Sequence, residues 1–91
     1  MDTSAFEAAL KADGYTEIEK KTVAPNVLNK AHAHPFAVRL LVLSGEMSVT
    51  ANGTMHTCRP GDTFAMEPGC EHIEQYGAEG ADYLVGRKHK S

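Results

Sequence analysis

The stretch that decides the fold is residues 46–59, with the sequence EMSVTANGTMHTCR. Two segments of alternating side chains, 46–51 and 55–59, flank the dipeptide Asn52-Gly53. Both central residues of a type I′ turn need a positive φ, which Asn and Gly adopt most readily. The stretch therefore predicts an antiparallel β-hairpin with one strand in each segment.

Similar short segments continue on both sides of this hairpin. They are rich in β-branched or alternating residues and predict further strands at 15–24, 32–43, 63–66, 71–76 and 81–86. Turn signals separate them at Ser44-Gly45, Pro60-Gly61-Asp62, Pro68-Gly69 and 77–80. Strands and turns at this spacing favour an all-β sandwich or barrel over parallel βαβ units.

The N-terminal segment has a helical pattern instead. Its apolar residues recur at helical spacing, and Asp13-Gly14 supplies a stop signal. A chain of 91 residues is long enough for one small domain. We expect a short helix at about 4–12, a core barrel at about 15–86 and a solvated basic tail at 87–91.

Composition narrows the class of protein. The formal net charge is −3 with mixed charges along the chain, so no basic stripe indicates a nucleic-acid partner. The longest aliphatic run, 40–43, is far too short to cross a membrane. Two cysteines, Cys58 and Cys70, make no disulfide framework, and the N-terminus lacks a signal-peptide pattern. These features predict a cytoplasmic, reduced protein, with Cys58 as a small buried hydrophobe.

Three histidines predict a metal site. His32 and His34 are one residue apart at the start of an expected strand, and His72 follows the turn signal Pro68-Gly69. On a strand, residues i and i+2 share a face with Cα atoms roughly 6.5–7 Å apart. Two such imidazoles can bind one ion, and a third from a distant strand would leave positions open for water or substrate. The alternative is three ordinary polar residues satisfied by hydrogen bonds.

The spacing around these histidines resembles the two sequence motifs of the cupins. The first motif is Gly, five residues, His-x-His, three or four residues, Glu, six residues and Gly. This chain has, in the same order, Asn26, His32-Ala33-His34, Val38 and Gly45. The second motif is Gly, five residues, Pro-x-Gly, two residues, His, three residues and Asn.

The second motif also has a counterpart. The chain has Gly61, five residues, Glu67-Pro68-Gly69, two residues, His72, three residues and Tyr76. The resemblance covers residues 26–76 and indicates a small single-domain cupin of the conserved-barrel type. It implies a jelly-roll β-barrel.

Departures from the motifs change the expected site. Val38 stands where cupins have a carboxylate ligand, and Arg39, at the alternative spacing, points to the opposite face of a regular strand. The resemblance therefore implies a three-histidine site of His32, His34 and His72, like that of cupins without a carboxylate ligand. Iron(II) is our first expectation for the metal, and nickel, zinc, manganese and copper also accept imidazole ligands. Three neutral imidazoles leave the ion its full +2 charge and up to three open positions, which favours anionic or chelating ligands.

Three further residues are candidates for this site. Glu74 lies two residues after His72 and shares its face, so it could bind the ion or orient an imidazole. Cys70 could bring its thiol to the barrel mouth, and the Tyr76 phenol could contact a bound substrate or water. For each of them the alternative is an ordinary polar or packing role.

Three functions follow from the resemblance. Three-histidine cupins imply an enzyme like a non-haem metal dioxygenase, which inserts oxygen into a small substrate that chelates the metal. The second possibility is a non-enzymatic cupin that binds a metal or metabolite for sensing or storage. The third is a metal-free structural barrel. Fold alone does not choose between them.

The run at 39–43 predicts how the chain assembles. Leu40 and Val42 take one face of the strand, and Leu41 and Leu43 take the other, so both faces need cover. The barrel lumen covers one face only. Burying two leucines against a partner would contribute roughly 3–6 kcal/mol. We therefore expect a two-fold homodimer packed sheet to sheet, unless the N-terminal helix covers this face instead.

Overall fold

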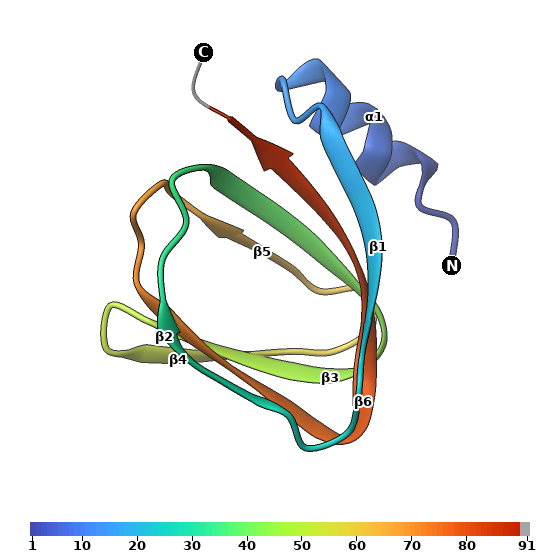
Figure 1. Ribbon diagram of the computed structural model, residues 1–91. Helices are drawn as coiled ribbons and strands as arrows, with labels where there is room; N and C mark the ends of the chain where they lie inside the picture. The colour runs from blue at the N-terminus through green and yellow to red at the C-terminus, as the bar shows by residue number, and fades with distance from the viewer. Residues whose placement is uncertain (90–91) are drawn as a thin grey trace.

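The computed structural model describes residues 1–89 and consists of one helix and six strands (Figure 1). The elements are α1 (Ser4–Ala12), β1 (Glu17–Val23), β2 (Leu28–His32), β3 (Ala37–Ala51), β4 (Thr54–Cys58), β5 (Thr63–Met66) and β6 (His72–Lys88). All strand pairs are antiparallel. Within the described part of the chain, no helix has the length and apolar character needed to cross a bilayer.

Two long strands, β3 and β6, run through both halves of the barrel. In one half, residues 37–45 of β3 pair with 81–88 of β6, and β1 and β5 flank them. In the other half, residues 47–51 pair with 72–76, and β2 and β4 flank them. The two halves curve around a common interior (Figure 1). The predicted all-β barrel is confirmed.

Two of the predicted turns are wrong, because β3 and β6 pass through them without ending. The chain bends at Gly45 and Gly80, whose φ angles are 76° and 69°, and the register shifts on either side of Gly45. A Cβ atom on Gly45 would lie 2.0 Å from the carbonyl oxygen of Gly80. Glycine here permits a close crossing of two backbones rather than a loop.

The predicted strand over 32–43 is also wrong at its start. β2 ends at His32, and β3 begins only at Ala37. Pro35 lies between them and has no N–H to donate to a ladder. Instead, the backbone N–H of Gly69 donates to the carbonyl oxygen of His34 at 2.8 Å. His32 and His34 are therefore not neighbours on one strand, as predicted. His32 ends a strand, and His34 lies in a segment that is hydrogen-bonded to the Pro68-Gly69 turn.

The short-range predictions fared better. Asn52 and Gly53 have φ angles of 52° and 77°, and the hairpin pairs Ala51 with Thr54 as a two-residue type I′ loop requires. The predicted helix 4–12 and strand 63–66 match α1 and β5. At the other end, β6 runs to Lys88, so the first two residues of the predicted basic tail belong to the barrel. Lys90 and Ser91 of that tail lie outside the described residues.

The core lies between the two halves of the barrel. It is formed by buried side chains from β3, β4, β5 and β6, with Val42 and Val49 fully buried at its centre. Cys58 is one of its members, which confirms it as a small buried hydrophobe. Phe64 is partly buried against it.

The outer face of the barrel is covered in part by α1 (Figure 1). Leu10 is fully buried, and its side chain lies against Gly86, where an added Cβ would come within 2.7 Å of it. On the same face of the sheet, Leu41 pairs with Leu84, and both are less than a tenth exposed in a single chain. Arg39 also lies on this face and bonds Asp13 at 2.6 Å, away from the barrel interior.

The homodimer stays a prediction with a direct test. Leu43 is still only partly covered in the single chain, so this face has apolar surface left for a partner. Light scattering at micromolar concentration is expected to report twice the mass of one chain. A monomeric mass would mean that α1 alone provides the cover.

Candidate metal centre

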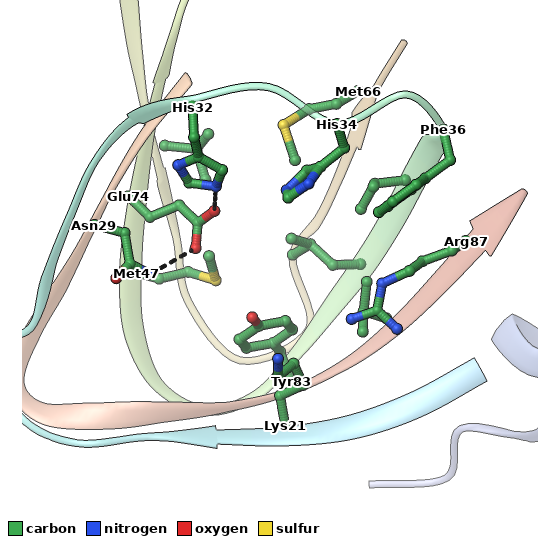
Figure 2. A pocket seen from close by; sticks show the side chains of 14 residues that line it. Lys21, Asn29, His32, His34, Phe36, Met47, Met66, Glu74, Tyr83 and Arg87 are labelled. Atoms are coloured by element: carbon green, nitrogen blue, oxygen red, sulfur yellow. Dashed lines mark hydrogen bonds and ion pairs between the residues drawn. The ribbon is translucent and has the colours of Figure 1, made fainter. Parts of the chain in front are cut away.

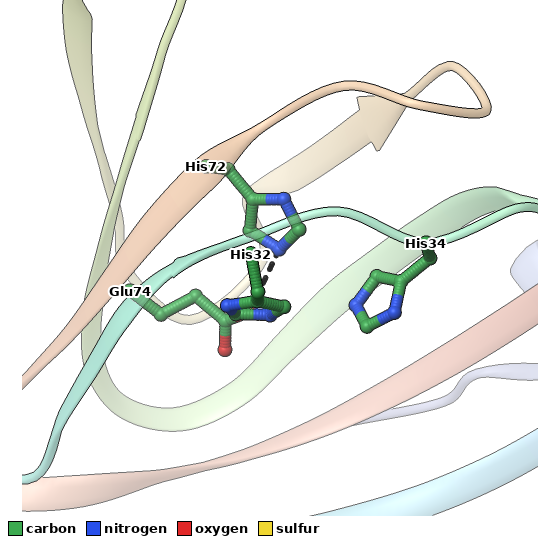
Figure 3. A group of neighbouring side chains, drawn as sticks. All are labelled: His32, His34, His72 and Glu74. Atoms are coloured by element: carbon green, nitrogen blue, oxygen red, sulfur yellow. Dashed lines mark hydrogen bonds and ion pairs between the residues drawn. The ribbon is translucent and has the colours of Figure 1, made fainter.

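Four side chains, from β2, the segment that follows it and β6, meet at one end of the barrel interior (Figure 3). His32 ends β2, His34 follows it, and His72 and Glu74 lie at the start of β6. The antiparallel register sets His32 opposite His72. One ligand atom from each of the four lies within 4.8 Å of every other. The structure thus brings together the three predicted histidines and adds Glu74.

The spacing of these ligand atoms suits a single ion. The ring centroid of His32 lies 4.9 Å from that of His34 and 4.2 Å from that of His72. The ring centroids of His34 and His72 are 5.3 Å apart. Ligand atoms about 2.1 Å from one ion are at most about 4.2 Å from each other. Small side-chain rotations therefore close the set around a metal ion.

Local backbone groups orient two of the imidazoles. The Nδ1 atom of His72 lies 3.0 Å from the carbonyl oxygen of Cys70, and that of His32 lies 2.7 Å from the carbonyl oxygen of Lys30. A carbonyl only accepts hydrogen bonds, so Nδ1 carries the proton in both rings. In the neutral ring, Nε2 is then the free ligand atom.

Glu74 faces these same Nε2 atoms. Its Oε2 lies 3.0 Å from His72 Nε2 and 3.3 Å from His32 Nε2. Its other oxygen, Oε1, accepts hydrogen bonds from the Tyr76 hydroxyl at 2.7 Å and from the Asn29 amide at 3.4 Å. One carboxylate oxygen is therefore held by neutral donors while the other is directed at the histidines.

The charge on Glu74 is stabilised despite its position. Its side chain is only 12% exposed, and this burial opposes ionisation. The hydrogen bonds from Tyr76 and Asn29 and the nearby His72 outweigh burial and lower the pKa of Glu74 below its ordinary value. Glu74 is thus an anion at neutral pH.

A positive charge between the rings and the carboxylate would suit this arrangement. With Nδ1 protonated, a neutral imidazole would turn a lone pair toward the lone pairs of Glu74 Oε2. Either a second proton on each ring or one metal ion resolves this contact. The three neutral nitrogens and one carboxylate that result are a donor set suited to divalent transition metals.

His34 completes the set of four, and its ring is held by a contact of a different kind. Its ring stacks on Phe36 with centroids 4.9 Å apart and planes at 16°. Burial lowers the pKa of His34, and a positive charge on His32 or His72 would lower it further. This imidazole is therefore held in the neutral form that binds a metal.

The other predicted candidates divide into two groups. Tyr76 is buried and reaches the site through Glu74, and burial raises its pKa, with the hydrogen bond to Glu74 adding to the effect. Cys70 lies outside the group of four, with its Sγ near the carbonyl oxygen of Glu71 at 3.8 Å. Val38 is buried and lines the same cavity as His32 and His34.

The sequence did not reveal the charged wall of this cavity. Lys21 and Arg87 line it together with the metal-site residues (Figure 2). Arg87 pairs with the cavity-lining Val38 in the sheet register, and Lys21 with Tyr83. Side-chain parity along the predicted strand 81–86, continued by one residue, is the signal that could have found Arg87, which was assigned to the tail instead.

Similarity to known proteins agrees with this architecture. The family model of the cupin domain matches residues 17–81. A comparison with curated proteins finds no match. Among solved structures, a protein of unknown function from Rhizobium leguminosarum superposes with a TM-score of 0.75 at 23% identity, covering 80% of this chain and 69% of that one.

Two further structures show the same fold at low identity. A cupin 2 conserved barrel domain protein from Salinispora arenicola has a TM-score of 0.69 at 19% identity, covering 78% of this chain and 60% of that one. Oxalate decarboxylase from Bacillus subtilis, a protein with Mn(II) centres, has a TM-score of 0.72 at 24% identity. That match covers 81% of this chain and 21% of the enzyme, so this chain spans about a fifth of its length. With a family model matching most of its length and a barrel that superposes on these structures, the chain belongs to the cupin domain family.

Proposed function

We propose that this cupin holds a divalent transition metal through His32, His34, His72 and Glu74 and acts on a small substrate that chelates the metal. The observation that carries the proposal is the contact of Glu74 Oε2 with the Nε2 atoms of two rings whose Nδ1 atoms face backbone carbonyl oxygens. One metal ion bound by the four groups would satisfy all of them at once. When bound, it supplies Lewis acidity or redox chemistry.

The protein's own residues define what such a site can do. Four protein ligands leave two positions of an octahedral ion for substrate or dioxygen. Asn29 and Tyr76 hold the carboxylate, and a cavity with both apolar and charged walls lies next to it. We propose an oxidoreductase like a non-haem metal dioxygenase that works in the cytoplasm.

Iron(II) remains our first choice of metal, because a site of neutral imidazoles and one carboxylate with open positions suits non-haem iron. Manganese is the second choice. Its support is that the structurally similar oxalate decarboxylase has Mn(II) centres.

Metal analysis of protein purified without an affinity tag tests this proposal. We expect about one transition-metal ion per chain, and expect His34→Ala to lose it together with thermal stability, because the ion binds only the folded site. His56→Ala is the matched control, since His56 is exposed and outside the group of four. A wild-type protein without metal, or a His34→Ala variant with unchanged metal, would contradict the proposal.

Oxygen consumption then tests the reaction. The metal-loaded protein is expected to consume dioxygen with one member of a panel of diketones, thiols and phenols. A protein that retains its metal but consumes no oxygen with any of them would fit a sensor or storage role instead.

The stability of the metal-free protein should depend on pH through His34. Its folded-state pKa lies below the ordinary value of 6.5, so between these two values the unfolded chain binds more protons. The free energy of unfolding should therefore fall as pH falls below about 6.5. Urea denaturation between pH 7.5 and 5.5, with chelator present, is expected to show a shallower decline for His34→Gln than for the wild type. Equal slopes would mean that His34 titrates alike in both states.

A further inference from the structure

The cavity next to the metal site has a second charged region. The cavity volume is about 170 Å³, below the roughly 300–1,000 Å³ of sites for drug-sized ligands. His32, His34 and Glu74 line one part of it, and Lys21 and Arg87 line another (Figure 2). Val38, Leu40 and Val85 are among the apolar residues that complete the wall.

Arg87 is held in place at this wall by two carboxylates. Its Nη1 donates to Glu17 at 3.2 Å and to Glu19 at 3.0 Å, while its side chain is 14% exposed. Among the described residues, these bonds use Nη1 alone, and neither Glu17 nor Glu19 lines the cavity. An Arg side chain has five N–H donors, so Nε and Nη2 keep donors for a ligand.

Lys21 adds a second positive charge on the neighbouring strand. Residues 17, 19 and 21 of β1 alternate onto one face, which pairs with Arg87, Val85 and Tyr83 of β6. Lys21 is half-buried at the cavity, and no ion pair joins it to a described carboxylate. Two cations thus line a small cavity, with a partly apolar wall, at its side away from Glu74 (Figure 2).

We infer that Arg87 and Lys21 form a carboxylate-binding subsite, and that the substrate is a small organic acid with a carboxylate at one end and a metal-chelating oxygen group at the other. This inference rests on the proposed function for the metal-bound end only. A planar carboxylate accepts two parallel hydrogen bonds from a guanidinium, and the ammonium of Lys21 adds charge. The cavity volume limits the substrate to a few carbon atoms between the two ends.

Short dicarboxylates are suitable probes. Malonate, succinate and glutarate would be titrated calorimetrically into the manganese-loaded and the metal-free protein, with the matching diamides as neutral counterparts. We expect at least one dicarboxylate to bind, its diamide to bind far more weakly, and Arg87→Gln to weaken the dicarboxylate about 10-fold or more. Lys21→Gln is expected to weaken it by a smaller factor.

The chain offers matched controls for both variants. Lys88 and Lys20 are the next-door cations on the same strands, exposed and on the opposite face, so Lys88→Gln and Lys20→Gln change net charge equally. They should leave the affinity for the dicarboxylate unchanged. Metal content, measured in each variant, should stay at the wild-type level.

The outcomes separate the two proposals. The subsite would be overturned if Arg87→Gln and Lys88→Gln weakened dicarboxylate binding equally, or if neither variant weakened it. It would also be overturned if no dicarboxylate bound better than its diamide. The same holds if Arg87→Gln lowers only thermal stability, because Arg87 would then serve to join β1 and β6. A wild-type protein that binds no metal contradicts the proposed function, while charge-dependent binding of the dicarboxylate to that protein would still support the subsite.

Discussion

Glu74→Gln is expected to lower the affinity for a divalent metal about 100-fold or more, although it changes the shape of the side chain very little. The substitution removes the one negative charge among the four ligand groups and leaves Nε2 of His32 and His72 facing a neutral amide. Loss of a partner that only orients a ligand typically costs 10–100-fold, and loss of a ligand costs more. Competition titrations with a chelating dye would measure the change.

Glu71→Gln is the matched control, because Glu71 is exposed three residues earlier on the approach to β6. It should bind metal like the wild type. Unchanged affinity in Glu74→Gln would show that Glu74 is not a ligand and that the site works with histidines alone.

Val38→Glu provides a rescue for the same experiment. Val38 occupies the position of the usual cupin carboxylate and lines the cavity with His32 and His34. Adding Val38→Glu to Glu74→Gln is expected to restore about 10-fold or more of the lost affinity. Failure to rescue would mean that a carboxylate at this position does not reach the ion.

Gly45→Ala is expected to destabilise the protein by about 3 kcal/mol or more, or to prevent folding. Its Cβ would lie 2.0 Å from the Gly80 carbonyl oxygen and 2.9 Å from Ala81 Cα, and these backbone atoms cannot move without separating β3 from β6. Urea denaturation would measure the loss. The site should suffer as well, because β6 also carries His72 and Glu74.

Gly53→Ala separates this steric effect from the cost of a positive φ. Gly53 has nearly the same φ, 77° against 76°, but no atom lies within 4 Å of a Cβ placed there. Its substitution should cost only about 1 kcal/mol. Similar losses in the two variants would contradict the close crossing of the two strands.

The sequence predicted those parts of the fold that short-range signals control. Asn52-Gly53 determines its own turn, and the alternation in 63–66 determines its own strand. It failed at Gly45 and Gly80, because a glycine in a turn and a glycine at a crossing of two strands look alike in the sequence. Only the partner strand distinguishes the two, and it lies more than thirty residues away.

The site was predictable to a similar degree. The spacing of His32, His34 and His72 was enough to group them, although His34 is not on the expected strand. Glu74 was a candidate through its parity with His72, but its contacts with Asn29 and Tyr76 depend on the pairing of β2 with β6. Arg87 was missed because a run of cations at a chain end is usually solvated, whereas here the pairing with β1 and β3 extends the strand.

The backbone bonds of His32 and His72 have a consequence for transferring this site to another protein. Each ring is tied through Nδ1 to the carbonyl two residues upstream, so each carries its orienting partner within a three-residue segment. Rotamer freedom is thus lost during folding rather than on metal loading. Such a segment is portable: grafted onto the end of a strand in an unrelated barrel, it should present the same imidazole nitrogen without any help from the host.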